Sequence, residues 1–358
     1  MNTRYDLTQL GVTPELIQTF EAHAIAGLHL GRVGAQYRGG YVLLAECGEL
    51  LATAPGRMRR EPGALPAVGD WVAFEPLPEG KSIVRAILPR RSKLSRAQRD
   101  ANERQRAASE QVLAANIDLV FVVSALAGEF KLRRIERYLA AAWESGASPV
   151  VVLTKSDLCD DVPALVAEAE TVAIGVPVYP ISSTSGEGLA DVRALLSAGV
   201  TAALIGSSGV GKSTLANRLL ARAAQDVQEI RSDGRGRHTT THRELFLVPG
   251  GGLILDTPGL RVLEVWDGEG LGEAFADVDE LALECRFNDC RHESEPDCAV
   301  RSAIEAGALD PARLGSYRRL EAETAYLARR DDKRLQSEER RKYRVLSRDM
   351  RAGQRSGR

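Results

Sequence analysis

The segment Gly206-Ser207-Ser208-Gly209-Val210-Gly211-Lys212-Ser213 decides the fold of this chain, because it matches G-x-x-x-x-G-K-[ST] at every defined position. An apolar run at 202–205 precedes it and a helical pattern at 213–220 follows it, which is the context of a phosphate-binding loop. Its glycines let successive backbone N–H groups turn toward phosphate oxygens, beside the positive end of the next helix. We expect Lys212 to reach the β- and γ-phosphates of a nucleotide and Ser213 to ligate Mg²⁺.

A second motif, Asp256-Thr257-Pro258-Gly259, follows the apolar run 253–255. Alone it is an ordinary turn, but after a phosphate-binding loop we expect Asp256 to hold Mg²⁺ through water and the glycine to approach the γ-phosphate. The segment 234–242 between the two motifs is rich in glycine and threonine, as a nucleotide-sensing switch loop is. One of its threonine hydroxyls is expected to complete the Mg²⁺ shell, and the choice among Thr239, Thr240 and Thr241 stays open.

The segment Thr154-Lys155-Ser156-Asp157 follows the apolar run 150–153. A carboxylate at Asp157 can accept hydrogen bonds from N1–H and the 2-amino group of guanine, a donor pair that adenine lacks, so it selects GTP over ATP. The stem of Lys155 can lie along the base. GTPases usually carry Asn at the position of Thr154, and taken by itself the segment is as consistent with a surface loop. A second loop, at 181–184, is where GTPases often place a backbone contact to guanine.

Strands and helices alternate from about residue 112 to 262, which predicts a doubly wound parallel α/β domain. The base motif precedes the phosphate loop, the reverse of the usual order, so the domain is circularly permuted, with the join near 186–201. The new chain break falls just after 256–259, and we expect the C-terminal region to anchor it. The expected strands are 119–123, 150–153, 176–181, 202–205 and 253–255, and the expected helices are 132–143, 163–173, 189–196 and 212–223.

The N-terminal part has a different pattern. Pro14–Ala24 predicts a short helix capped by Thr13. Five or so short β-prone runs between 35 and 92, separated by Gly and Pro, predict a small all-β barrel. The basic stretch Arg90–Arg106 is interpreted as an exposed linker.

Three of the five cysteines and one histidine lie close together as Cys285-x4-Cys290-x-His292-x5-Cys298. Three thiolates and one imidazole form a complete tetrahedral set for a structural Zn²⁺, with no position left for water. The alternative is a group of buried cysteines beside a solvated histidine. We expect one Zn²⁺ per chain, which folds a small, mostly helical module that lacks a core of its own.

The composition of the 358 residues, 44% hydrophobic and 27% charged, is that of a globular protein with two or three domains. No apolar run reaches the roughly 18–20 residues of a membrane helix, and no secretory signal opens the chain, so we expect a cytoplasmic protein without membrane contact. The net charge of −2 conceals segregation. Residues 85–106 hold eight basic and two acidic side chains, 264–284 hold eight acidic and no basic ones, and 329–358 hold twelve basic and five acidic ones. Such segregation favours a polyanionic partner, and the alternative is that the basic runs are a solvated helical face and a loose tail.

Taken together, TKSD, GSSGVGKST ending at Thr214, GRHTTT and DTPG in this order resemble the circularly permuted, small-subunit-dependent GTPases of the RsgA or YjeQ family. The resemblance extends to V-G-D-W-V at 68–72 and to the Cys/His cluster. It implies an N-terminal extension (1–34), an OB-fold barrel (35–95), a permuted GTPase domain (96–265) and a zinc-binding domain with a basic tail (266–358). It also implies a monomer with slow GTP hydrolysis that the small ribosomal subunit accelerates during its late maturation, and contacts of the barrel and zinc domain with rRNA.

The resemblance also implies a catalytic residue. GTPases often place Gln just after D-x-x-G to orient the attacking water, and Leu260 occupies that position here. The family's water-positioning histidine maps onto His238. His242 is the competing candidate, and without the resemblance His238 is interpreted as a solvent-facing loop residue.

Other classes of function remain open at this stage. The chain is alternatively an RNA-binding assembly protein in which nucleotide only sets conformation, or a P-loop kinase or ATPase, against which Asp157 argues. A barrel of this kind also binds peptides. The tail beyond Ala328 is either a docking helix or a polycation that orders on rRNA, and the role of residues 1–34 is not assigned.

Overall fold

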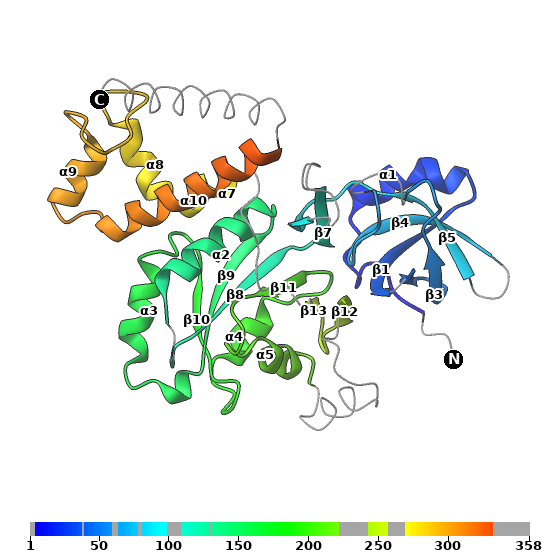
Figure 1. Ribbon diagram of the computed structural model, residues 1–358. Coiled ribbons are helices and arrows are strands. Elements are labelled where there is room, and N and C mark those ends of the chain that lie inside the picture. The colour runs from blue at the N-terminus through cyan, green and yellow to red at the C-terminus, as the bar shows by residue number, and fades with distance from the viewer. Residues whose placement is uncertain are drawn as a thin grey trace, which may run out of the picture.

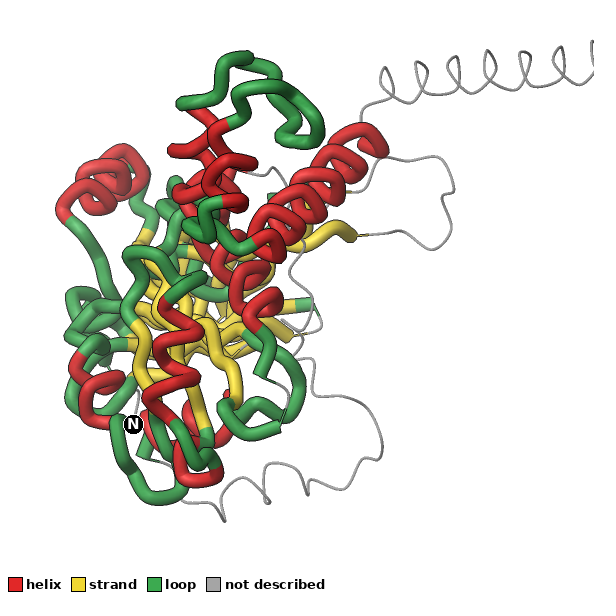
Figure 2. Tube along the Cα trace, turned by 90° about the vertical axis from the view of Figure 1, so that its left-hand side faces the viewer, coloured by secondary structure: helices red, strands yellow, loops and turns green. Residues whose placement is uncertain are grey.

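The computed structural model describes residues 4–37, 39–58, 64–77, 81–98, 109–128, 130–221, 243–256 and 269–331. A β-barrel lies at one end, an α/β domain in the middle and a group of helices at the other end (Figure 1). Seen from the side, the strands form the interior and helices lie outside them (Figure 2). Within the described residues, no helix combines the length and apolar character that crossing a membrane requires.

The N-terminal barrel is closed and is preceded by helix α1 (Pro14–Ile25). Thr13 caps α1 as predicted, since its hydroxyl accepts the N–H of Leu16 at 3.3 Å. The first strand begins at His29, so the predicted boundary at residue 35 falls inside it. Glycines and a buried arginine hide its strand pattern in the sequence. The strands, ordered β1-β2-β3-β5-β4 and closed by β4 on β1, are β1 (His29–Tyr37), β2 (Gly40–Ala45), β3 (Gly48–Thr53), β4 (Trp71–Pro76) and β5 (Lys81–Ile87).

The expectation of an exposed linker over Arg90–Arg106 is wrong in part. Strand β6 (Lys93–Gln98) pairs antiparallel with β7 (Ser109–Ala115), which the sequence did not predict. Leu94 and Leu113 of this two-stranded ribbon are buried. The basic residues conceal a strand whose partner lies more than ten positions further along the chain.

The central sheet confirms the predicted parallel α/β domain. Its strand order is β10-β9-β8-β11-β13. Alternate residues face opposite sides: Val120 and Val122 pack in the core that includes α2, while Phe121 and Val123 pack in the core that includes α5. The elements are β8 (Leu119–Ala125), α2 (Leu132–Glu144), β9 (Ser148–Thr154), η2 (Ser156–Leu158), α3 (Val162–Glu170), β10 (Val178–Pro180), α4 (Leu189–Ala194), β11 (Thr201–Ile205), α5 (Lys212–Leu219) and β13 (Leu253–Asp256).

Strand β12 (Arg243–Leu247) was not predicted, and it joins the two β-structures into one eleven-stranded sheet. It pairs antiparallel with β13 on one side and with β1 of the barrel on the other, where Ala35 lies opposite Glu244. Arg243 also donates to Gln36 at 3.4 Å. The first residues of β12, Arg243 and Glu244, are charged and obscure its strand pattern in the sequence.

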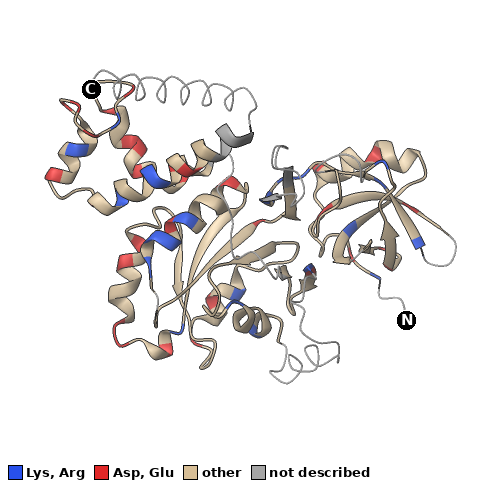
Figure 3. Ribbon diagram, viewed as in Figure 1, with Lys and Arg blue, Asp and Glu red and all other residues tan. Residues whose placement is uncertain are grey.

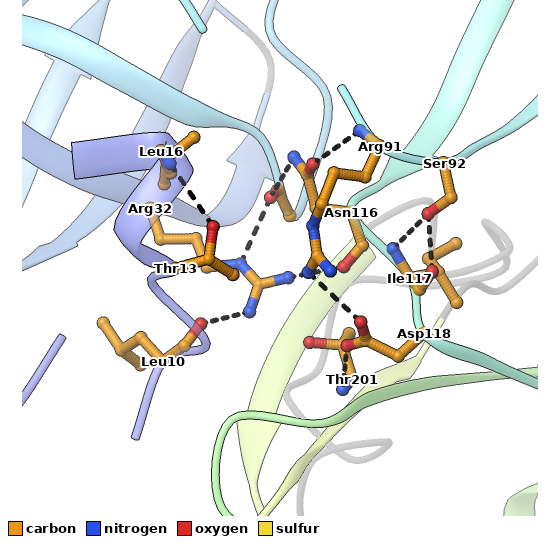
Figure 4. Close-up of polar contacts among 11 residues, drawn as sticks. Leu10, Thr13, Leu16, Arg32, Arg91, Ser92, Asn116, Ile117, Asp118 and Thr201 are labelled. Atoms are coloured by element: carbon orange, nitrogen blue, oxygen red, sulfur yellow. Dashed lines mark hydrogen bonds and ion pairs between the residues drawn. The ribbon is translucent and has the colours of Figure 1, made fainter. Parts of the chain in front are cut away.

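A buried arginine ties the N-terminal segment, the barrel and the α/β domain together. The Arg32 guanidinium donates to the carbonyls of Leu10, of Gly69 at 3.2 Å and of Asn116 at 2.8 Å (Figure 4). It also lies 5.6 Å from the ring centre of Trp71. Burial lowers its pKa to about 10, so it stays charged at neutral pH.

The C-terminal region is helical, as predicted, with α7 (Glu269–Ala274), α8 (Ala276–Leu283), α9 (Ala299–Glu305) and α10 (Pro311–Asp331). Arg313 of α10 connects it to the α/β domain by donating to Glu136 of α2 at 3.0 Å and to Asp277 of α8 at 2.8 and 3.0 Å. Its guanidinium carbon lies 4.4 Å from the ring centre of Phe275. Asp277 belongs to the acidic run at 264–284, part of which lies on α7 and α8 (Figure 3).

Candidate nucleotide site and metal centre

The phosphate-loop segment connects β11 to α5, as the motif requires. Gly206 has φ +145°, and a Cβ there would lie 2.2 Å from the carbonyl oxygen of Val123, so only glycine fits. The Lys212 ammonium donates to the carbonyls of Gly206 at 2.7 Å and Ser207 at 2.6 Å. With Gly211 at the N-cap, no side chain caps the first turn of α5. The first N–H groups of this helix are therefore available to phosphate oxygens.

The predicted base motif forms a tight turn at the carboxyl end of β9. Lys155 adopts a left-handed conformation with φ +62°, and η2 then presents Asp157 at an exposed position. The Ser156 N–H donates to the carbonyl of Ile181 at 3.1 Å, and the Ile181 N–H donates to Leu153 at 2.7 Å. The base motif and the second predicted loop, after β10, therefore lie side by side.

Thr154 brings the base motif against the phosphate loop. It is 1% exposed, and its hydroxyl donates to the carbonyl of Val210 while lying 3.3 Å from the carbonyl of Ser124. A Cβ on Gly211 would lie 3.4 Å from the same hydroxyl. The two sequence-distant segments thus meet at one edge of the sheet, where ligands bind in open α/β folds.

Several predicted residues lie outside the described part of the chain: His238, His242, Thr239, Thr240, Thr241 and the segment 257–259. The backbone of Asp256 ends β13, next to β11, and its role as a Mg²⁺ ligand stays a prediction.

A contact near the phosphate loop escaped the sequence analysis. The Tyr138 hydroxyl of α2 lies 3.5 Å from the hydroxyl of Ser207. The neighbouring residues Glu136 and Arg137 pair with Arg313 and Glu323 of α10. No motif marks these residues, because the contacts join segments 69 to 186 positions apart.

The structure brings the predicted cysteines and histidine into one cluster. The Sγ of Cys285 lies 3.8 Å from that of Cys298 and 3.6 Å from Nδ1 of His292, which is 3.4 Å from the Cys298 sulfur. The four donor atoms, including Sγ of Cys290, all lie within 4.8 Å of one another. Metal–sulfur bonds of about 2.3 Å in a tetrahedron require sulfur–sulfur separations of about 3.8 Å, so the cluster fits a tetrahedral metal ion.

The surroundings of the cluster shift the pKa values of its members in different directions. Burial, with a contribution from Arg318, lowers the pKa of His292 and favours the neutral imidazole that binds metal. The pKa of Cys285 lies below its usual value. Burial opposes ionisation of this thiol, but hydrogen bonds, first among them those from the N–H groups of Val300 and Ala299, favour the thiolate by more. Burial raises the pKa of Cys290 to about 11, so a bound cation is what would ionise this thiol.

A phosphate loop that follows its base motif on a parallel sheet defines a circularly permuted P-loop GTPase, here with an N-terminal barrel and a helical region that carries a metal-binding cluster. The sequence model of the RsgA GTPase family matches residues 87–266. Proteins named "Small ribosomal subunit biogenesis GTPase RsgA" are 45% identical in Opitutus terrae, over 98% of both chains, and 47% identical in Streptomyces coelicolor, over 94% and 92%. The chain belongs to the RsgA GTPase family and is a GTPase.

Solved structures agree. YjeQ from Thermotoga maritima covers 83% of this chain and 99% of its own, with a TM-score of 0.62 and 26% identity. YloQ, described as a circularly permuted GTPase, covers 83% of this chain and 95% of its own, with a TM-score of 0.60 and 27% identity. The predicted fold class is confirmed.

Proposed function

We propose that this GTPase acts in the late maturation of the small ribosomal subunit, hydrolysing GTP slowly alone and faster on the subunit. The observation that carries this proposal is the 45% identity, over 98% of both chains, to a protein named for small ribosomal subunit biogenesis. Similarity over this whole length is consistent with one partner that contacts the barrel, the GTPase domain and the C-terminal region. The protein acts as a monomer. It works in the cytoplasm, where it binds small ribosomal subunits.

The proposed GTP site comprises the segments 154–157 and 206–214. Asp157 accepts hydrogen bonds from N1–H and the 2-amino group of guanine, and Lys212 neutralises the β- and γ-phosphates. Ser213 and Asp256 hold Mg²⁺, which when bound neutralises charge that develops on the phosphates. The hydrogen bond between Thr154 and Val210 supports this arrangement, because it places the base motif and the phosphate loop at the same edge of the sheet.

The water that attacks the γ-phosphate requires a positioning group. Leu260 follows D-x-x-G in this chain and has no atom that can accept a proton from water. We assign this role to His238, whose imidazole can hold the water by a hydrogen bond.

The Cys285, Cys290, His292 and Cys298 cluster holds a structural Zn²⁺. Four protein ligands leave no open position, so the ion stabilises the module between α8 and α9 and takes no part in hydrolysis. The zinc domain and the barrel bind rRNA of the small subunit.

The test is GTP turnover measured with and without purified small subunits. We expect stimulation of at least about tenfold, the least that would indicate a group positioned by the subunit, since such groups contribute about 10²–10⁴-fold. We expect Lys212→Ala to abolish it. Binding of subunits without stimulation would instead support an RNA-binding assembly protein in which hydrolysis is incidental. ATP competing as well as GTP would overturn the guanine site.

A further inference from the structure

An arginine on the phosphate-loop helix holds the loop that follows β10. Arg218 lies six positions after Lys212 on α5. Its Nε donates to the carbonyl of Ser183 at 2.6 Å, and its Nη2 donates to the carbonyl of Thr184 at 2.7 Å. Two donors of one planar guanidinium on consecutive carbonyls fix both the distance and the orientation of the loop.

The loop is also folded on itself. The buried hydroxyl of Ser182 accepts the N–H groups of Thr184 at 3.2 Å and Ser185 at 3.1 Å, and the Gly186 N–H donates to the Ser182 carbonyl at 2.9 Å. These bonds define the internal shape of the loop. The Ser156 N–H, which donates to the Ile181 carbonyl, ties the start of the loop to the base motif, and the Arg218 bonds tie Ser183 and Thr184 to α5.

Two buried hydroxyl oxygens, one in this loop and one in the adjoining base motif, have no hydrogen-bond partner among the residues that the structure describes. One is Oγ of Ser183, in the loop that Arg218 holds, and the other is Oγ of Ser156, in the base motif. Buried hydroxyls are normally hydrogen-bonded, so these two oxygens are hydrogen-bonding capacity in adjoining loops that no described residue uses.

We propose that Arg218 is a positioning residue for the guanine base. This proposal rests on the proposed GTP site. Arg218 holds Ser183 and Thr184 at a set distance from the phosphate loop. The loop that carries Ser183 and Thr184 therefore lies beside Asp157 when α5 binds the phosphates. One helix thereby sets the span between the phosphate and base subsites. Because Arg218 acts on the base and not on the phosphates, its loss raises the KM for GTP and leaves kcat unchanged.

A structural role for Arg218 predicts something different. Arg218 also lies in the last turn of α5, where any cation interacts favourably with the helix dipole. In that role Lys would replace Arg without loss, and removal of the charge would weaken binding of all nucleotides equally.

The experiment compares Arg218→Met and Arg218→Lys with the control Arg193→Met in the full-length chain. Arg193 donates to the carbonyl of Arg218 at 2.8 Å and, among the described residues, makes no hydrogen bond to the loop, so the control disturbs the same end of α5 alone. Affinities for GDP are measured directly and those for ADP by competition, and GTP turnover gives KM and kcat. Thermal unfolding confirms that each variant is folded.

We expect Arg218→Met to weaken GDP about tenfold, since charge-assisted bonds to two carbonyls are lost, and to leave ADP affinity and kcat unchanged. Arg218→Lys should be intermediate, because an ammonium is a point charge that does not reproduce the two-pronged contact, and Arg193→Met should match wild type. Equal losses for GDP and ADP, full activity of Arg218→Lys, or no loss at all would overturn the assignment. A wild-type chain that binds ADP as well as GDP would instead overturn the proposed GTP site.

Discussion

The hydroxyl of Thr154 donates a hydrogen bond to the carbonyl of Val210, across 56 positions of sequence. This contact joins two segments at the carboxyl end of the parallel sheet, since Thr154 ends β9 and Val210 lies in the phosphate loop. Asn is usual at this position in GTPases, and the shorter Thr still reaches the loop because Gly211 lets the two backbones approach. Nucleotide affinity should therefore depend on a residue that need not touch the nucleotide.

Replacing Thr154 with Val tests this contact. The change keeps the shape but leaves the Val210 carbonyl without its donor, so we expect a loss of about 1–3 kcal/mol in the free energy of unfolding. GDP affinity should fall about tenfold, as a loss of about 1.4 kcal/mol implies, because the phosphate loop is less well held. Thr171→Val is the matched control, since Thr171 is exposed and its hydroxyl donates to Glu168 at the end of α3. Equal behaviour of the two variants in calorimetry and fluorescence titration would contradict the prediction.

Asp157→Asn should exchange the base preference from guanine to xanthine. An amide accepts the N1–H of xanthine and donates to its 2-oxo group, whereas it opposes the 2-amino group of guanine with a second donor. Xanthine nucleotides should bind at least about a hundredfold better relative to GTP than in the wild type, as expected where a site loses a matched polar pair. Competition titration with both nucleotides measures this ratio. An unchanged ratio would show that Asp157 does not contact the base.

His238→Ala should retain GTP binding and lose stimulated hydrolysis, because its imidazole is proposed to position the attacking water. A loss of about 10²–10⁴-fold is typical for such a group. The comparison variant is His242→Ala, the competing candidate in the same switch loop. Should turnover on small subunits survive in His238→Ala and fail in His242→Ala, the assignment moves to His242.

Arg313→Met should loosen the C-terminal helices from the α/β domain. It leaves the buried carboxylate of Glu136 without its cation, and breaking such a pair costs about 3–5 kcal/mol. The exposed pair Arg301–Glu305, with its 3.6 Å separation, provides the control. Arg301→Met should change unfolding by about 0.5 kcal/mol or less. Limited proteolysis and calorimetry distinguish the two, and an undiminished melting temperature for Arg313→Met would refute the interdomain role.

Cys298→Ser should remove the bound metal and unfold the segment 285–298, since this segment is held by the cluster. We expect about one zinc per chain in the wild type and far less in the variant, measured by elemental analysis. GDP affinity should remain, because the nucleotide site lies on another domain. Cys159→Ser, outside the cluster, should keep its zinc. Full zinc content in Cys298→Ser would exclude this ligand set.

Local patterns were sufficient for much of the fold. The phosphate loop, the parallel strands, the cap at Thr13 and the metal cluster were all predicted from short segments, because each depends on residue types at fixed spacing. Strands β7 and β12 were missed, and β6 was interpreted as a linker. Each is short, charged or interrupted, and each is stabilised by a partner far away in the sequence.

The sequence by itself determined which chemical groups this protein carries and in which order, since motifs such as the phosphate loop are conditions on neighbouring residues. The tertiary structure decided what those groups meet. Arg32 contacts Asn116 across 84 positions, Arg313 contacts Glu136 across 177, and Arg218 reaches the loop at Ser183. Hydrogen bonds of this kind form only after the chain has folded, because their geometry is set by the packing of whole strands and helices. No local pattern of residues encodes them.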